Sequence, residues 1–178
     1  MIKNIFDDPT YIVLNMPSPA AESIREIRRQ FDPARADMSV EITLAGSGGL
    51  GTVQEGQSPE KVFAEVDRIA AATEPFAAHF GEITRFADSG VCDYTVLPAE
   101  SFIEIQEMLA GSPIRFTPCP FPYIPHCTLI LYEDERELNT DSQSLLALRS
   151  RFGINCGNCG GGRDWIPDLC WIRSRFTA

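Results

Sequence analysis

Pro125-His126-Cys127-Thr128-Leu129 is the stretch of sequence from which the fold is predicted. A proline-rich loop precedes it, and the apolar residues that follow predict a β-strand over 126–132. Side chains two residues apart on a strand share one face of the sheet, so His126 and Thr128 are expected to point the same way. An imidazole that exchanges a proton near neutral pH, beside a hydroxyl that donates to a phosphate oxygen, forms an acid–base and anchoring unit. The motif therefore predicts half of a phosphate-handling site.

A tetrapeptide of the same shape occurs earlier in the chain, 85 residues before this one when the two threonines are compared. Glu41-Ile42-Thr43-Leu44 repeats the order of a titratable residue, a small or apolar residue, threonine and leucine. The segment Met38–Ala45 alternates apolar and polar residues, which predicts a strand with one core face and one accessible face. Side by side, the two strands would point Glu41, Thr43, His126 and Thr128 into one groove.

The whole chain predicts six strands and four helices in the order β-α-β-α-β-β-α-β-α-β. The strands are expected at 11–15, 38–45, 76–87, 91–97, 126–132 and 169–176, with a hairpin turn at 88–90. The helices are expected at 18–31, 58–72, 101–109 and 141–151. Two similar β-α-β arrangements, ending near Leu44 and Leu131, indicate an internally duplicated α+β domain rather than a doubly wound parallel sheet. Because no linker-like composition separates the halves, 1–178 is expected to be one domain.

The charge balance limits the class of partner. The net charge is −10, whereas long nucleic acids are bound largely by neutralising their phosphates with lysine and arginine. No binding to long nucleic acid is therefore expected. A local basic pocket for one phosphate or one RNA end is still compatible with this net charge. No apolar run approaches 18 residues, so no membrane span is expected. Residues 1–10 lack the apolar core of a signal peptide, which favours the cytoplasm.

The six cysteines do not predict a disulfide framework. Four of them are scattered among apolar residues, as is typical of buried free thiols in a reducing compartment: Cys92, Cys119, Cys127 and Cys170. Cys156-Gly-Asn-Cys159 is a single C-x-x-C pair in a glycine-rich loop without two further metal ligands at a convincing spacing. A solvent-exposed loop is favoured there over metal or redox chemistry. Outside the motif, His79 is expected to be a partly buried structural histidine at the start of a strand.

The paired tetrapeptides resemble the two-histidine phosphoesterases, which include the 2′-5′ RNA ligase and RNA 2′,3′-cyclic phosphodiesterase enzymes. The hallmark of that family is a pair of H-x-[ST]-apolar motifs at about this separation. Pro125–Leu129 is similar to the second motif in full, whereas the strand Met38–Ala45 is similar to that of the first but carries Glu41 where the family has histidine. The resemblance extends in element order from Tyr11 to Tyr132. It implies two pseudo-symmetric β-α-β lobes with antiparallel sheets around a central cleft.

The resemblance also implies roles for individual residues. In the family, one histidine activates water or a hydroxyl, the other protonates the leaving ribose oxygen, and two Ser/Thr hydroxyls hold the phosphate. His126 would then be one acid–base catalyst, with Thr128 and Thr43 as phosphate ligands and with no metal or cofactor required. Phe121 and Tyr123, in the loop before the motif, are candidates either to stack on a base or simply to pack that loop. The expected partner is a nucleotide or an RNA end with a terminal phosphate.

Glu41 leaves the function open. It is compatible with a general base, with a neutral acid whose pKa is raised, or with a site that has lost one catalyst. One hypothesis is a metal-independent phosphodiesterase or RNA ligase-like protein that acts on 2′,3′-cyclic phosphates or 2′-5′ linkages. The alternative is a catalytically weak or inactive module that binds a nucleotide or RNA end on the same fold. A third hypothesis is a fold retained for another partner, and the sequence does not indicate the oligomeric state.

Overall fold

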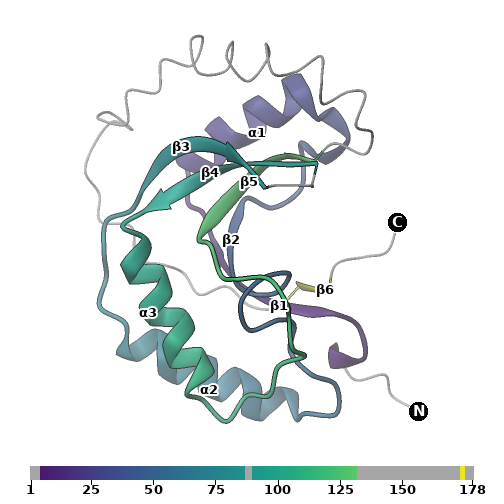
Figure 1. Ribbon diagram of the computed structural model, residues 1–178, viewed down its shortest axis with the longest axis vertical. Helices are drawn as coiled ribbons and strands as arrows, with labels where there is room; N and C mark the ends of the chain where they lie inside the picture. Colours follow the sequence, from purple (N-terminus) through teal and green to yellow (C-terminus); the bar gives the residue numbers. More distant parts are fainter. Residues whose placement is uncertain (1–4, 87–89, 132–172, 175–178) are drawn as a thin grey trace.

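The computed structural model describes residues 5–86, 90–131 and 173–174 of the 178-residue chain. Its elements follow one another as η1 (Ile5–Asp7), β1 (Thr10–Asn15), α1 (Ala20–Phe31), η2 (Pro33–Arg35), β2 (Glu41–Ala45), α2 (Pro59–Ala72), β3 (His79–Arg85), β4 (Val91–Leu97), α3 (Ala99–Ala110), β5 (His126–Leu131) and β6 (Arg173–Ser174) (Figure 1). The predicted helix 141–151 and most of the hairpin turn at 88–90 lie outside the described residues. The single-domain extent over 1–178 stays a prediction.

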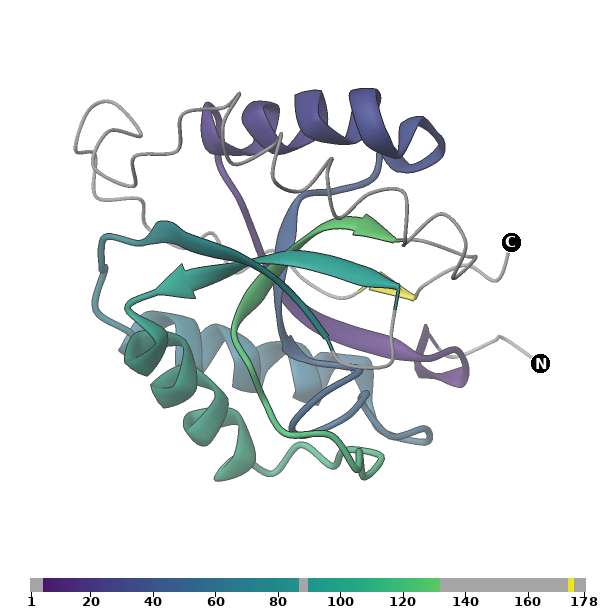
Figure 2. The same ribbon diagram turned by 45° about the horizontal axis from the view of Figure 1, so that its top comes forward.

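Two antiparallel sheets of three strands form the centre of the molecule. The first sheet has the order β2-β1-β6 and the second the order β3-β4-β5. All pairings among the described strands are antiparallel, which confirms an α+β fold with antiparallel sheets. The strands of the two sheets cross over one another (Figure 2), and β2 contacts β5 where the sheets meet.

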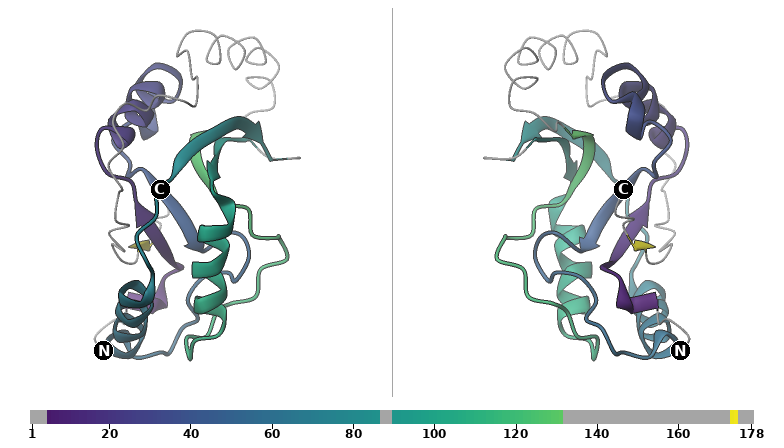
Figure 3. Two further views of the ribbon diagram at one scale, coloured as in Figure 1. Left: turned by 90° about the vertical axis from the view of Figure 1, so that its left-hand side faces the viewer. Right: turned by 90° about the vertical axis from the view of Figure 1, so that its right-hand side faces the viewer.

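Each half of the chain packs a helix against the motif strand of the other half. Helix α1, from the first half, contacts β5, and α3, from the second half, contacts β2. Helices α2 and α3 lie together at one end of the molecule and α1 lies at the other, with the strands between them (Figures 1 and 3). The hydrophobic core is consequently continuous across both sheets, because helices α1 to α3 and strands β1 to β5 all bury apolar side chains in it.

Sequence patterns explain where the helices begin and end. Ser58 caps α2, since its hydroxyl accepts a hydrogen bond from the Lys61 backbone N–H. Pro59 occupies the first helical position, where a backbone N–H would have no partner within the helix, so the missing N–H of proline costs no hydrogen bond. Helix α1 ends at Phe31, and Asp32 leads directly into the proline that opens η2. These two helices were predicted within one or two residues of their observed bounds.

The start of β3 differs from the prediction. The strand begins at His79, where pairing with β4 starts, rather than at 76, and the Phe76 ring before it packs edge-on against Phe102 of α3 with centroids 5.2 Å apart. His79 is exposed, so the prediction of a partly buried structural histidine was wrong. The alternation of the strand places Phe80, not His79, toward the core.

The cysteines in the described part of the chain are free thiols. Cys92 and Cys127 are buried, as predicted, and burial raises the pKa of Cys127 to about 12. Cys119 departs from the prediction because it is only half-buried in the proline-rich loop, where its thiol donates to the Ser47 carbonyl at 3.2 Å. Three further cysteines lie outside the described residues: Cys156, Cys159 and Cys170.

Among the described helices, none is both long and apolar enough to cross a membrane.

Arg28 of α1 joins the two motif strands through their backbones. Its guanidinium donates to the carbonyls of Thr128 at 2.7 Å and Leu129 at 3.3 Å on β5. It also donates to the carbonyls of Met38 and Ser39, both at 3.1 Å, just before β2. The side chain is buried, and this burial lowers the pKa of Arg28 from its ordinary value. The carbonyls before β2 therefore pair with a side chain rather than with a strand, which explains why β2 starts later than predicted.

Two loops near the motifs are hydrogen-bonded to each other. The chain that leaves β2 (residues 46–57) pairs with the chain that enters β5 (residues 111–125), with Gly49 N–H donating to Phe121 O at 2.9 Å and Thr117 N–H donating to Thr52 O at 2.8 Å. Gly51 has a φ of +85°, and a Cβ there would overlap the Thr117 carbonyl oxygen. Glycine is thus required for the close approach that holds the two loops together.

We expect Arg28→Met to lower the free energy of unfolding by about 3 kcal/mol, because it leaves four buried or half-buried carbonyls without their charged donor. Urea unfolding followed by circular dichroism measures the change. Arg29→Met is the matched control, since Arg29 is exposed on the same helix and pairs with the exposed Glu22 and Glu26. Equal midpoints for the two variants would contradict the structural role assigned to Arg28.

Candidate functional site

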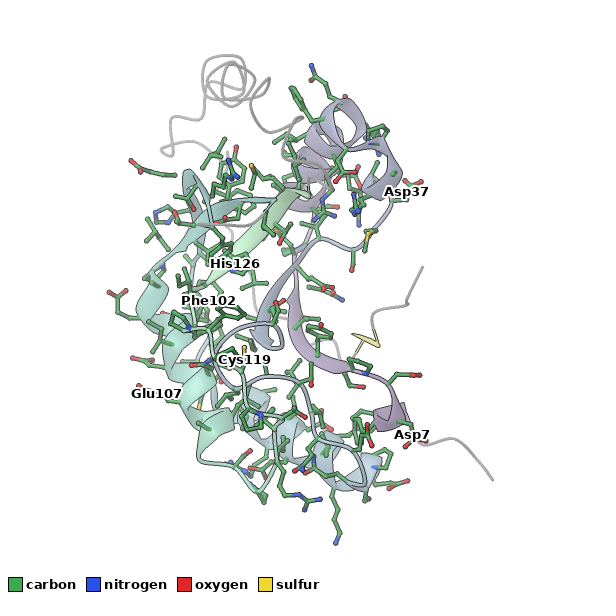
Figure 4. All side chains as sticks on the ribbon, turned by 45° about the vertical axis from the view of Figure 1, so that its right-hand side comes forward. Asp7, Asp37, Phe102, Glu107, Cys119 and His126 are labelled. Atoms are coloured by element: carbon green, nitrogen blue, oxygen red, sulfur yellow. The ribbon has the colours of Figure 1, made fainter. Side chains whose placement is uncertain are left out.

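The motif on β5 presents its two polar residues on the accessible side of the sheet. Cys127 and Leu129 are buried in the core, whereas His126 and Thr128 are only half-buried. This alternation is what the sequence predicted for a strand with one core face. His126 stands at the start of β5, close to the middle of the molecule (Figure 4).

Two contacts fix the His126 ring. Its Nδ1 lies 2.7 Å from the Ile124 carbonyl oxygen, and since a carbonyl only accepts, Nδ1 carries the hydrogen of this bond. The ring also packs edge-on against Phe86, with centroids 4.8 Å apart. The Nε2 atom is therefore the nitrogen left to take up or release a proton.

The motif on β2 has the same alternation. Ile42 and Leu44 are buried, whereas Glu41 and Thr43 are half-buried. The Glu41 carboxylate accepts a hydrogen bond of 2.7 Å from the Ser39 hydroxyl. The charge of Arg28 also acts on Glu41.

Tyr11 of β1 lies beside Thr43. A Cβ at Gly46 would overlap the Tyr11 ring and would lie 2.7 Å from the Thr43 methyl group. The absence of a side chain at Gly46 thus lets the Tyr11 ring settle next to Thr43. The structure therefore places the Tyr11 ring on the Thr43 side of the strand.

The structure brings the two tetrapeptides together. Strands β2 and β5 are in contact, and Glu41 interacts electrostatically with Cys127 of β5 as well as with Arg28. The four polar members are half-buried on these two neighbouring strands: Glu41, Thr43, His126 and Thr128. Their juxtaposition was inferred from sequence, and their catalytic and phosphate-binding roles stay predictions.

The two aromatic candidates of the proline-rich loop differ in exposure. Phe121 is 66% exposed, so its ring is accessible to a ligand. Tyr123 packs against the core beside Gly49 and Gln106, and burial raises the pKa of its hydroxyl far above the ordinary value. Within the described part of the chain that hydroxyl has no hydrogen-bond partner. Loop packing therefore accounts for Tyr123, and Phe121 is the better candidate for stacking on a base.

Asp93 of β4 belongs to this site and was not singled out from the sequence. It is 1% exposed and lies directly opposite Thr128 in the pairing of β4 with β5. Its Oδ2 accepts a hydrogen bond of 2.8 Å from Thr84, and its Oδ1 has no partner among the described residues. The signal available in the sequence was an aspartate inside the strand Val91–Leu97, since aspartate is depleted in strands and needs compensation when buried.

Burial raises the pKa of Asp93 above its ordinary value, and two weaker effects oppose it. The Thr84 hydroxyl and the positive charge of His126 both lower the Asp93 pKa. The buried carboxyl is therefore linked electrostatically to the imidazole of the motif, although only the imidazole is accessible to a ligand.

Outside the two motifs, the described surface has fewer side chains suited to catalysis or to binding a metal ion. No group of three or more His, Cys, Asp or Glu side chains in residues 5–86, 90–131 and 173–174 is placed to hold a metal ion. A hollow of about 700 Å³ lies between the end of α2 and helix α3. It is lined by Ala72, Thr73, Glu74, Pro75, Phe76, Ser101, Glu104, Ile105, Glu107 and Met108, none of which belongs to either motif.

Comparison with known proteins points to one family. A family model described as the 2′-5′ RNA ligase superfamily matches residues 16–164. Among solved structures, E. coli LigT complexed with 3′-AMP shares 22% identity over 70% of this chain and 72% of that chain, with a TM-score of 0.49. A phosphoesterase shares 23% over 70% and 72% with a TM-score of 0.47, and apo E. coli LigT shares 24% over 70% and 71% with a TM-score of 0.47. No curated protein matches the chain.

The raised pKa of Asp93 predicts a pH-dependent stability difference between the wild type and Asp93→Asn. Because the folded-state pKa lies above the value of about 3.9 for an unfolded aspartate, the contribution of Asp93 is fully present below that value and is lost as the pH rises through the folded-state pKa. The unfolding free energy of the wild type minus that of Asp93→Asn should thus fall as the pH rises.

Urea unfolding of both proteins between about pH 4 and pH 8 tests this sign. Asp67→Asn on α2 removes an exposed carboxylate and serves as the control for general charge effects. A difference that grows with pH would show that Asp93 is instead stabilised as an anion.

Proposed function

We propose, because this chain belongs to the 2′-5′ RNA ligase superfamily, that its paired motifs bind and open a 2′,3′-cyclic phosphate or a 2′-5′ linkage at the end of an RNA or nucleotide. The observation that carries this proposal is the fixed His126 ring. Its Nδ1–H is engaged by the Ile124 carbonyl, which leaves Nε2 to exchange a proton beside the half-buried Thr128 hydroxyl.

Two threonine hydroxyls support the binding of a phosphate. Thr128 on β5 and Thr43 on β2 are both half-buried, and their strands are in contact. A hydroxyl donates a hydrogen bond to a phosphate oxygen without carrying a charge of its own. Phe121, exposed in the loop before β5, supplies an aromatic face on which the base of the same ligand stacks.

The negative charge of Glu41 opposes the binding of a phosphate, but it is partly compensated. Arg28 places a buried positive charge within range of Glu41, and Ser39 donates a hydrogen bond to its carboxylate. Both interactions reduce the repulsion that a bare carboxylate exerts on an anionic ligand. This compensation allows a carboxylate at a position where the resemblance to the family calls for histidine.

The proposed reaction divides the proton transfers between the two motifs. Glu41 takes a proton from water, the water oxygen forms a bond to phosphorus, and the bond from phosphorus to one ribose oxygen breaks. Protonated His126 gives its Nε2 proton to that leaving oxygen, so charge and protons balance. We place this activity in the cytoplasm as part of the same proposal, since the buried free thiols Cys92 and Cys127 fit a reducing compartment.

We expect the purified full chain to hydrolyse an oligonucleotide with a 2′,3′-cyclic phosphate in the presence of EDTA. His126→Ala should lower the rate by on the order of 10²–10⁴, because it removes the proton donor of the leaving group. Chromatographic separation of cyclic and opened ends measures the rate. His79→Ala is the control, since His79 is exposed at the start of β3 and should leave the rate unchanged. Equal rates for both variants would refute the role of His126.

A second candidate function is binding without turnover, and Glu41 favours it because a carboxylate stands where the family motif has histidine. Substitutions at this position distinguish the two functions. If Glu41 is the general base, Glu41→Gln should reduce hydrolysis by on the order of 10²–10⁴ while the nucleotide still binds. If the site only binds, the wild type should show no turnover and Glu41→His should create it. Fluorescence titration with a labelled oligonucleotide reports binding in each variant.

A further inference from the structure

The pairing of β4 with β5 places Asp93 on the same face as both polar residues of the β5 motif. Asp93 is opposite Thr128, and Thr95 is opposite His126. Directly opposite residues of antiparallel strands share a face, so Asp93 is the diagonal neighbour of His126. The register shifts between Cys92 and Asp93, which is where a β-bulge re-aims side chains.

The Asp93 carboxyl is buried with an incomplete set of hydrogen bonds. It is 1% exposed, Oδ2 accepts from Thr84 at 2.8 Å, and Oδ1 has no partner in the described part of the chain. A buried carboxylate with a free oxygen is costly unless a positive charge compensates for it. The surroundings of Asp93 must therefore supply a cation or keep the group neutral.

The charged groups near the start of β5 come from three packed elements. Glu41 of β2, Arg28 of α1 and Asp93 of β4 all act on Cys127. Arg28 is engaged by four carbonyls and by the charge of Glu41, and Asp93 is not among the groups that act on it. On β3, Glu82 is exposed, and its backbone bonds to the Thr95 hydroxyl. Among the described residues that act on Asp93, the one with a positive charge is His126.

We propose that Asp93 is a positioning residue that holds His126 in its protonated form. This interaction assigns the acid to β5, where the proton would sit on Nε2 because Nδ1–H is bonded to the Ile124 carbonyl, and leaves the base to Glu41. Asp93 is too deeply buried to touch a ligand, so it acts only through His126. The catalytic meaning of this interaction rests on the proposed function, whereas the strand register that makes the two residues neighbours does not depend on substrate.

The interaction is reciprocal by linkage. A protonated His126 favours ionised Asp93, and ionised Asp93 favours protonated His126 by the same free energy. Burial still dominates the behaviour of Asp93, so the imidazolium compensates for only part of the cost of burying that charge. Thr84 belongs to the same arrangement, since its hydroxyl stabilises the ionised carboxylate on which the pairing depends.

Proton NMR of the ligand-free full chain tests the proposal, because the sequence contains only His79 and His126. The Cε1–H signals are followed as a function of pH in the wild type and in Asp93→Asn. We expect the His126 titration curve to move to lower pH in the variant, by on the order of one pH unit, because the imidazolium loses its counter-charge. The His79 curve, from an exposed residue outside the motif, should not move.

Thr84 provides a matched pair of variants. Thr84→Val removes the hydroxyl that stabilises ionised Asp93 and should move the His126 curve in the same direction by less, whereas Thr84→Ser keeps the hydroxyl and should leave it unchanged. If Asp93→Asn does not fold, as judged by circular dichroism, this pair decides the question.

A His126 curve that coincides with the wild type in Asp93→Asn, or that moves to higher pH, would overturn the proposal. Equal curves in Thr84→Val and Thr84→Ser would also overturn it. The titration needs no substrate, so its failure is separate from that of the proposed function. A shifted curve in a protein that hydrolyses no cyclic phosphate would uphold the Asp93–His126 pair and refute only the enzymatic proposal.

Discussion

The arrangement of the site depends on one buried cation. Arg28 reaches from α1 to the carbonyls of Thr128 and Leu129 on β5 and to those of Met38 and Ser39 before β2. A planar guanidinium presents several donors in fixed directions, so it restrains two backbones at once. The relative position of the two motifs is thus restrained by a buried contact.

Much of the fold was predictable from the sequence because its information is local. Alternation in Glu41–Ala45 and His126–Leu131 predicted which residues face the core, and the burial of Ile42 and Leu129 agrees with it. The likeness of the two tetrapeptides predicted that their strands would meet, and the contact between β2 and β5 confirms this. The pseudo-symmetry of the two halves stays a prediction.

What the sequence did not reveal depends on contacts between distant residues. Arg28 is 100 residues from Thr128 in the sequence, and nothing in the residue pattern of α1 indicates that this arginine binds the backbone of β5. Asp93 gains its importance from the register of β4 on β5, which no local pattern encodes. His79 was misjudged because an apolar neighbourhood in sequence does not say which face of the strand a residue occupies.

The crossed packing of the helices bears on how such a site is transplanted. Because α1 contacts β5 and α3 contacts β2, each motif strand pairs within its own half but packs against a helix of the other half. A graft of the β5 tetrapeptide onto another scaffold would carry the imidazole and the hydroxyl but not the guanidinium that secures their backbone. The smallest unit that can be transplanted is therefore the two halves together. Copying only the motif residues would transfer the imidazole and the hydroxyl without the contacts that hold them in place.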